Sequence, residues 1–274
     1  MNIKNDNILI IGAGNMGYAF ISALIENKVS PKKIYIIEKK PSARLKKIQK
    51  LKKIKIFNTI NKFEMNIKIS ITILTIKPNQ LGDIFSDELN NKIKNSLIIS
   101  IVAGKTHSTL KKLSKGNKNI ARAMTNTPAA VGWGTSIIYF AKTTTNDNKK
   151  RAMHLMNLIG QVEEVKSEKS IDTFTGLFGS GPAYLYLLIE IWSNYAKKNG
   201  FKYAEQMTVQ TILGSILLLL NTQEKPESLR KRVTSKGGTT EAALMELNNN
   251  QKFQKLFEKA ISKAIKKATT LSKS

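Results

Sequence analysis

A short apolar segment near the start of the chain runs directly into three closely spaced glycines. Ile8–Ile11 precedes Gly12-Ala-Gly-Asn-Met-Gly17, and residues 18–27 then carry apolar side chains at helical spacing. A second apolar segment, Ile34–Ile37, ends at Glu38. This order predicts a strand, a turn, a helix and a second strand. Because a helix that joins two parallel strands crosses over right-handedly, we expect a βαβ unit at the start of the fold.

The glycine spacing is typical of a dinucleotide-binding turn. In such a turn the first glycine makes the bend, the second lets the backbone approach a pyrophosphate, and the third permits close helix packing. The N–H groups at the start of the helix also favour an anion. We therefore expect Gly12–Gly17 to bind a nicotinamide dinucleotide, and the alternative is a purely structural turn.

Further apolar segments alternate with helical patterns as far as residue 165. Strands are expected at residues 69–76, 96–102 and 136–140, and helices at residues 45–51 and 80–89. Strands that alternate with helices predict an α/β domain with a doubly wound, Rossmann-type sheet over residues 1–165.

The remaining residues, 166–274, predict an all-helical domain. Helices are expected at residues 171–200, 203–220 and 241–272, with a kink at Gly179-Ser-Gly-Pro182, because a proline and two glycines inside a helix cost several kcal/mol. Parts of the first two helices are apolar on more than one face. A domain of this size cannot bury that surface alone, so we expect it to pack against a second copy of the chain.

The composition narrows the classes of partner. The formal net charge of the 274 residues is +26, but the excess is almost all lysine, and no arginine-aromatic pattern of a nucleic-acid module occurs. We expect no nucleic-acid partner. The chain has no cysteine and only two histidines, without ligand spacing, so no metal site is expected. No signal peptide or membrane-spanning segment is expected either, which favours a cytoplasmic protein.

A second glycine turn precedes a helical pattern late in the chain. Val233-Thr-Ser-Lys-Gly-Gly-Thr-Thr240 leads into an apolar helical segment that begins at Glu241. Such a turn directs backbone N–H groups toward an anion, and its threonines can cap the helix or contact a ligand. Two anion-binding turns in one chain suggest that two anionic ligands are brought together.

Other motifs follow expected strands. Thr75-Ile-Lys-Pro78 and Ser100-Ile-Val-Ala-Gly104 lie where ligands approach an α/β sheet, and a polar, turn-rich stretch, Arg122–Pro128, offers the amide of Asn126. The coenzyme remains open at Glu38. A carboxylate there favours NADH, whereas the neighbouring Lys39, Lys40 and Arg44 could hold the 2′-phosphate of NADPH.

Together these motifs resemble the pyrroline-5-carboxylate reductase family. The resemblance extends almost from end to end and is carried by Ile11–Gly17, Lys77-Pro78, Ala103-Gly104, Arg122–Pro128, Gly179-Ser-Gly-Pro-Ala-Tyr184 and Val233–Thr240. It implies a Rossmann domain, a helical dimerisation domain, and reduction of 1-pyrroline-5-carboxylate to L-proline with NADPH or NADH. It also implies interlocked dimers that can assemble into decamers.

The resemblance also implies roles for individual residues. The cofactor would contact Gly12, Ala13, Gly14, Asn15, Met16, Gly17, Glu38, Lys39, Asn61, Ile76, Lys77, Pro78, Ala103, Asn126 and Arg232. The substrate would contact Glu168, Ser180, Gly181, Gly237, Gly238, Thr239 and Thr240. Its carboxylate would be held by backbone N–H groups of Gly238, Thr239 and Thr240, and the Thr240 hydroxyl would bond the ring nitrogen as the catalytic group.

Some positions depart from the family's usual pattern. Thr125 and Lys236 stand where proline is frequent, Arg232 stands where the family often has a cofactor-contacting asparagine, and Glu38 stands where a small polar residue often binds the 2′-phosphate. Two alternative functions remain open. A β-hydroxyacid dehydrogenase would need a lysine base on a long helix of the second domain, but the candidates Lys197 and Lys198 lie beyond the helix kink and are expected to be exposed. The other class is a non-catalytic cofactor-binding or nucleic-acid-binding protein.

Overall fold

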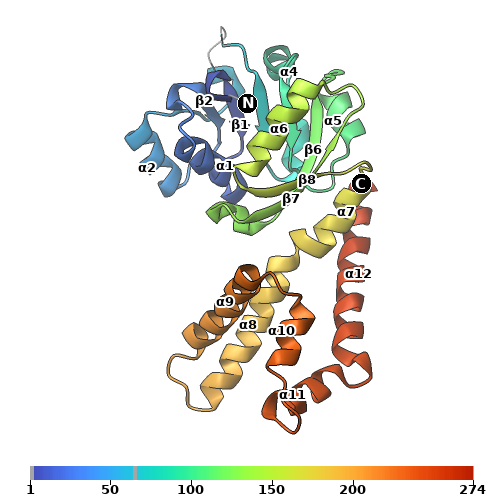
Figure 1. The fold of residues 1–274 in the computed structure, drawn as a ribbon. Helices are drawn as coiled ribbons and strands as arrows, with labels where there is room; N and C mark the ends of the chain where they lie inside the picture. Colours follow the sequence, from blue (N-terminus) through green and yellow to red (C-terminus); the bar gives the residue numbers. More distant parts are fainter. Residues whose placement is uncertain (1–2, 64–66, 274) are drawn as a thin grey trace. The chain divides into compact units, whose positions relative to one another are not determined.

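The computed structural model describes residues 3–63 and 67–273 (Figure 1). The chain divides into two compact units. One comprises the chain up to Ser180 together with the residues from Ala264 onward, and the other comprises Gly181–Lys263.

One sheet organises the first unit. Its strands lie in the order β3-β2-β1-β4-β5-β6-β7-β8, and neighbouring strands are parallel except for the antiparallel pair β6 and β7. Ile8 of β1 pairs with Ile34 of β2 on one side and with Ile71 of β4 on the other. The strand order therefore reverses beside β1, at the carboxyl end of which a doubly wound sheet binds its ligand. The strands are β1 Ile8–Ile11, β2 Ile34–Ile37, β3 Lys55–Phe57, β4 Ile71–Leu74, β5 Leu97–Ser100, β6 Ile120–Thr125, β7 Gly134–Phe140 and β8 Gly160–Glu164.

Helices cover both faces of this sheet. They are α1 Asn15–Glu26, α2 Ala43–Lys52, α3 Leu81–Ile84, α4 Asp87–Ile93, α5 His107–Leu113, α6 Asn146–Asn157 and α7 Ser170–Phe174. Short 3-10 turns lie at Ile3–Asn5, Pro31–Lys33, Ile60–Lys62, Pro78–Gln80 and Thr127–Val131.

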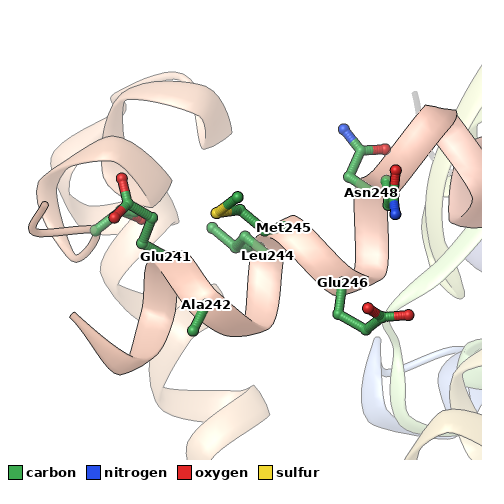
Figure 2. Close-up of a pocket in the computed structure, with 8 residues that line it drawn as sticks. Glu241, Ala242, Leu244, Met245, Glu246 and Asn248 are labelled. Atoms are coloured by element: carbon green, nitrogen blue, oxygen red, sulfur yellow. The ribbon is translucent and has the colours of Figure 1, made fainter. Parts of the chain in front are cut away.

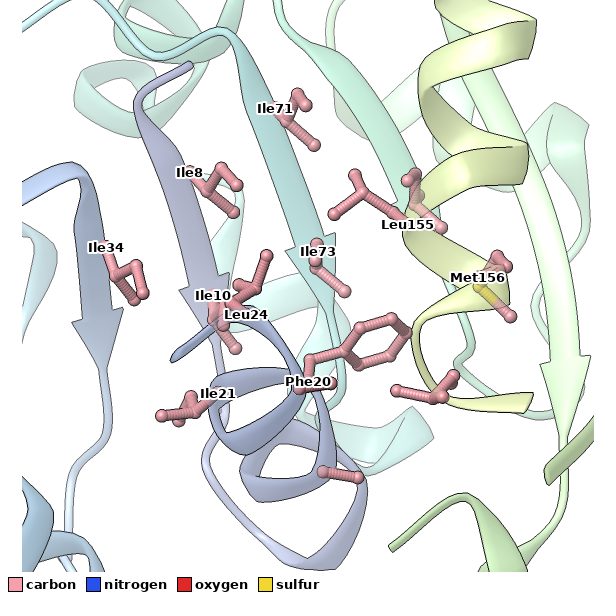
Figure 3. Close-up of a cluster of buried hydrophobic side chains, with 14 of the residues drawn as sticks. Ile8, Ile10, Phe20, Ile21, Leu24, Ile34, Ile71, Ile73, Leu155 and Met156 are labelled. Carbon is pink, nitrogen blue, oxygen red and sulfur yellow. The ribbon is translucent and has the colours of Figure 1, made fainter. Parts of the chain in front are cut away.

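Alternate residues of each strand enter opposite cores. Ile8 and Ile10 of β1 belong to the core under α1, α2 and α6, whereas Leu9 and Ile11 belong to the core under α3, α4 and α5. Figure 3 shows Phe20 of α1 and residues of α6 gathered over β1 and β4. Because both faces are buried, the central strands are continuous apolar runs, which is why they could be predicted from the sequence.

The helices of the second unit leave almost every side chain accessible. They are α8 Gly181–Lys198, α9 Ala204–Thr222, α10 Pro226–Arg232, α11 Thr239–Asn248 and the first part of α12 Lys252–Lys273, with a 3-10 turn at Asn249–Gln251. Within Gly181–Lys263, all of which the structure describes, only Ser193, Ala204 and Thr208 are buried. This unit has no apolar core of its own.

Several sequence predictions need correction. The stretch 122–128, predicted to be polar and turn-rich, begins inside the buried strand β6. Arg122 can be buried in this strand because its guanidinium is paired with a carboxylate, that of Glu168. The expected helix at residues 80–89 is two short helices that break near Phe85. The elements β3, β8, α5, α6 and α10 were not predicted.

The predicted break at Gly179–Pro182 is present. A π turn, Thr175–Gly179, ends just before α8 begins at Gly181. Pro182 lies in the first turn of α8, where a missing N–H is tolerated.

Candidate active site

The first glycine turn is closed on one side and open on the other. Gly12 has a φ of +91°, and a Cβ there would lie 2.7 Å from Cγ2 of Ile76. A Cβ at Gly17 would meet the Gly12 carbonyl oxygen, whereas a Cβ at Gly14 would meet nothing within 4 Å. The Thr75 hydroxyl also donates to the Gly12 carbonyl at 2.5 Å, which fastens the turn to the end of β4. The open side at Gly14 is therefore the side from which a ligand can approach the backbone.

A cavity of about 510 Å³ lies beside this turn, at the carboxyl ends of β1, β2 and β4. Of the residues predicted to bind the cofactor, it is lined by Gly12, Gly14, Glu38, Lys39, Asn61, Ile76 and Lys77. The others do not line it: Ala13, Asn15, Met16, Gly17, Pro78, Ala103, Asn126 and Arg232. The volume, the position at the strand reversal and the open glycine fit a dinucleotide, whose pyrophosphate would meet the start of α1.

Glu38 is fixed at the edge of this cavity. Its Oε2 accepts a hydrogen bond from Ala13 N–H at 2.7 Å, and its Oε1 accepts one from Lys40 N–H at 2.9 Å. Arg44 lies on the α1 side, where its guanidinium donates to Asn15 Oδ1 at 2.8 Å and covers the Tyr18 ring at 4.2 Å. A negative charge is thus held beside the glycine turn, and a cation is held beside the start of α1.

Asn126 connects three segments through its side-chain amide. Its Oδ1 accepts a hydrogen bond from Thr135 N–H at 2.9 Å, and its Nδ2 donates to the Phe178 carbonyl at 3.2 Å. Both ends of the amide are therefore engaged by the protein. Ala103, predicted for the same part of the site, packs against the small apolar cluster between β6, β7 and α7.

Arg122 is the centre of a buried charge cluster that was not predicted. Its guanidinium, 3% exposed, lies 2.9 Å from Glu168 Oε1 and 3.4 Å from Asp172 Oδ1. Glu168 Oε1 also accepts the His107 N–H at 2.6 Å, and Asp172 Oδ2 accepts the Ser272 hydroxyl at 2.7 Å. Glu168, predicted to bind substrate, thus also anchors this arginine. The available signal was an arginine within an apolar run, together with two carboxylates at helical i,i+4 spacing.

His107 belongs to the same neighbourhood. Burial lowers the pKa of its imidazole, against an opposing attraction from the Glu168 carboxylate and with a smaller lowering from Lys111. Its Nε2 is buried and has no hydrogen-bond partner within the described part of the chain. Both observations favour the neutral imidazole.

The second glycine turn precedes α11. Gly237 has a φ of +72°, and its N–H donates to Glu241 Oε2 at 2.6 Å. Gly238 N–H donates to the Ser235 carbonyl at 3.0 Å, so this member of the predicted trio of carboxylate donors is already occupied. No described residue accepts a hydrogen bond from the N–H groups of Thr239 and Thr240, which form the first turn of the helix. These two remain available to an anion.

Two other predicted contacts are engaged locally. The Arg232 guanidinium lies 2.6 Å from Glu224 Oε1 in an ion pair between α10 and the segment before it. The Ser180 hydroxyl donates to the Thr175 carbonyl at 3.1 Å, inside the π turn. Neither residue lines the cavity beside the first glycine turn.

The residues that the structure describes contain no group of three or more histidine, cysteine, aspartate or glutamate side chains able to hold a metal ion. None of the described helices is both long enough and apolar enough to cross a membrane.

A doubly wound sheet with an open glycine turn at its strand reversal, in a chain that continues into an all-helical unit, defines a two-domain oxidoreductase of the Rossmann class. The family model described as pyrroline-5-carboxylate reductase dimerisation matches residues 168–271, and the model described as NADP oxidoreductase, coenzyme F420-dependent, matches residues 7–104. The chain belongs to the pyrroline-5-carboxylate reductase family.

Individual relatives are similar to this chain over almost its full length. Pyrroline-5-carboxylate reductase 1 of Bacillus subtilis is 31% identical over 97% of this chain and 88% of its own length. The structure of a pyrroline-5-carboxylate reductase from Coxiella burnetii has a TM-score of 0.86 at 32% identity, covering 98% of this chain and 99% of that one. The Plasmodium falciparum pyrroline carboxylate reductase, solved with NADP bound, shares the fold with a TM-score of 0.84 at 24% identity, over 99% and 100% of the two chains.

Proposed function

We propose that this chain reduces 1-pyrroline-5-carboxylate to L-proline with a nicotinamide dinucleotide, the last step of proline biosynthesis. The observation that carries the proposal is the chain-long similarity to enzymes of this name, in a protein that keeps an open glycine turn at the strand reversal. When bound, the dinucleotide supplies the hydride for the imine carbon.

The cofactor residues are proposed in two groups. The turn Gly12–Gly17 would receive the pyrophosphate, since Gly14 leaves its backbone accessible. Glu38, Lys39, Asn61, Ile76 and Lys77 would contact the rest of the molecule from the cavity walls. Roles for Pro78, Ala103, Asn126 and Arg232 rest on the family resemblance alone.

The substrate residues are proposed at the start of α11. The N–H groups of Thr239 and Thr240 would hold the substrate carboxylate, because they are unpaired donors at a helix N-terminus. The Thr240 hydroxyl would donate to the ring nitrogen. Gly237 and Gly238 would shape the turn. Substrate contacts of Glu168, Ser180 and Gly181 rest on the family resemblance alone.

The reaction requires little general acid or base catalysis. Reduction of a cyclic imine adds a hydride, which is a proton with two electrons, to carbon and a proton to nitrogen. A carboxylate anchored on two backbone donors fixes which face of the ring is presented, and a hydroxyl on the nitrogen stabilises the charge that develops there. Positioning and electrostatic stabilisation therefore supply most of the rate enhancement.

The chain forms homo-oligomers through its dimerisation domain. We propose that residues 166–274 are the dimerisation and substrate domain, that the basic assembly is a dimer, and that dimers can assemble into decamers. We also propose a cytoplasmic location, which is consistent with a biosynthetic enzyme.

The test is direct. Purified protein is mixed with pyrroline-5-carboxylate and either NADPH or NADH, and loss of nicotinamide absorbance and formation of proline are followed together. Turnover with at least one coenzyme supports the proposal. A β-hydroxyacid substrate assayed in parallel with NAD(P)⁺ covers the alternative dehydrogenase, for which Lys197 and Lys198, the candidate bases, are exposed. Absence of imine reduction with either coenzyme would refute the proposed function.

A further inference from the structure

Glu241 is fastened to the turn that precedes its own helix. It is the third residue of α11, and its carboxylate reaches back to accept the Gly237 N–H at 2.6 Å. The Gly238 N–H is held by the Ser235 carbonyl at 3.0 Å. Two hydrogen bonds thus fix two consecutive backbone groups, and Glu241 supplies one of them.

The turn held in this way has little freedom to relax. Gly237 is in the left-handed region, at a φ of +72°, and a Cβ at Gly238 would come within 2.5 Å of the Ser235 hydroxyl oxygen. The chain leaves this turn directly into Thr239 and Thr240, whose N–H groups have no acceptor among the described residues. The direction of these two donors therefore depends on the turn, and the turn depends on the Glu241 carboxylate.

The same carboxylate also acts through its charge. A helix N-terminus carries roughly half a positive charge, which a side-chain anion in the first turn partly offsets. An anionic ligand at Thr239 and Thr240 would meet that reduced potential. Figure 2 shows Glu241 at one end of an open hollow along α11, whose apolar lining comes from Ala242, Leu244 and Met245. Among the described residues, those that line this hollow include a second carboxylate, Glu246, and no cation, so nothing in its lining neutralises Glu241.

We propose that Glu241 is a positioning residue for the substrate carboxylate, with two opposed effects. Its hydrogen bond to Gly237 keeps the Thr239 and Thr240 donors in place, and its negative charge weakens binding of the anion they hold. The inference rests on the proposed function, because it assigns the anion at α11 as the imine carboxylate.

Two substitutions separate the effects. Glu241→Gln keeps an oxygen acceptor and removes the charge, whereas Glu241→Ala removes both. The Gln variant should lower KM for pyrroline-5-carboxylate by about two- to fivefold, the usual range for a charge at a helix terminus. In the Ala variant, KM for pyrroline-5-carboxylate should be about fivefold above that of the Gln variant. This factor corresponds to the usual free-energy cost of losing a side chain that caps a helix N-terminus. In both, KM for the coenzyme should stay unchanged.

Glu246→Gln is the matched control, since it removes the same charge from the lining of the same hollow, at an exposed position outside the first turn of α11. Amide hydrogen exchange at Gly237 gives a readout independent of turnover: exchange should be fast in Glu241→Ala and slow in Glu241→Gln and the wild type. Equal substrate KM values in the Gln and Ala variants, or slow Gly237 exchange in the Ala variant, would overturn the positioning role. A substrate KM in Glu241→Gln equal to that of the wild type would overturn the charge effect. If the wild type itself does not reduce the imine, the proposed function fails, and the exchange measurement still decides whether Glu241 holds the turn.

Discussion

Glu38 and Ala13, 25 residues apart in the sequence, are joined by a hydrogen bond of 2.7 Å from the Ala13 N–H to the Glu38 carboxylate. The bond holds the acidic residue at the end of β2 against the first glycine turn. In Rossmann domains a carboxylate at this point binds the ribose 2′-hydroxyl, and it repels a 2′-phosphate. Lys39 and Lys40 are exposed beside it and have the opposite effect. Coenzyme preference should therefore depend on the balance between the fixed Glu38 carboxylate and these two lysines.

Replacing Glu38 by Gln or Ser should raise the ratio of kcat/KM for NADPH to that for NADH. The expected change is roughly 5–30-fold, since a charge within about 8 Å of a phosphate near the protein surface contributes on the order of 1–2 kcal/mol. Gln keeps an acceptor for the Ala13 N–H, so it isolates the charge. Asp83→Asn, which removes a charge from the wall of the same cavity, is the control. An unchanged ratio in both Glu38 variants would mean that the carboxylate does not face the ribose.

Thr240→Ala should lower kcat because it removes the hydroxyl assigned to the imine nitrogen. Loss of one well-placed donor costs about 2–4 kcal/mol in the transition state, or roughly 30- to 1,000-fold in rate. Thr240→Ser keeps a hydroxyl and should keep most of the activity, whereas Thr239→Ala keeps the backbone donor and should change kcat little. Steady-state kinetics with saturating coenzyme measures all three. A folded Thr240→Ala protein with wild-type kcat would exclude the hydroxyl from proton transfer.

The first βαβ unit could be predicted from the sequence because its determinants are local. The strands β1 and β2 are buried on both faces and read as apolar runs, and the glycine spacing reports a turn whose geometry leaves no room for side chains at Gly12 and Gly17. The break before α8 could be predicted for the same reason, since Pro182 and its neighbouring glycines are expensive inside a helix.

The unpredicted features depend on contacts between distant residues. The stretch that begins at Arg122 was predicted to be a polar, turn-rich loop. Arg122 can lie in a buried strand because its guanidinium is paired with Glu168 and Asp172, which follow it by 46 and 50 residues. The strand β8 is partly exposed and lacks an apolar run. The Gly238 N–H is occupied because it donates to the Ser235 carbonyl, which closes a turn. Residue types alone do not predict this hydrogen bond.

His107 should make the folded state sensitive to mild acid. Burial lowers its pKa, so the folded chain takes up the imidazole proton at a lower pH than the unfolded chain, whose histidine titrates near 6.5. Its contribution to stability is therefore complete above about pH 6.5 and is lost as the pH falls below that value toward the folded-state pKa. Thermal melts between about pH 7.5 and 5.5 should show a smaller fall in Tm for His107→Gln than for the wild type. The other histidine provides the control variant, His154→Gln, and identical pH profiles for His107→Gln and wild type would contradict the assignment.

Ile191→Glu should disrupt the oligomer. The unit Gly181–Lys263 buries only Ser193, Ala204 and Thr208, while Leu187 and Ile191 of α8 are 56% and 59% exposed. Apolar surface of this extent on a helical unit without its own core must be covered by another copy, and a charge placed there would be buried without a partner, which costs about 3–5 kcal/mol. Light scattering on purified protein should show a lower mass, or aggregation, for Ile191→Glu. Lys198→Gln changes the net charge equally at an exposed site near the end of the same helix and should keep the wild-type mass. An Ile191→Glu protein that keeps the wild-type mass and Tm would show that this part of α8 lies outside the subunit interface.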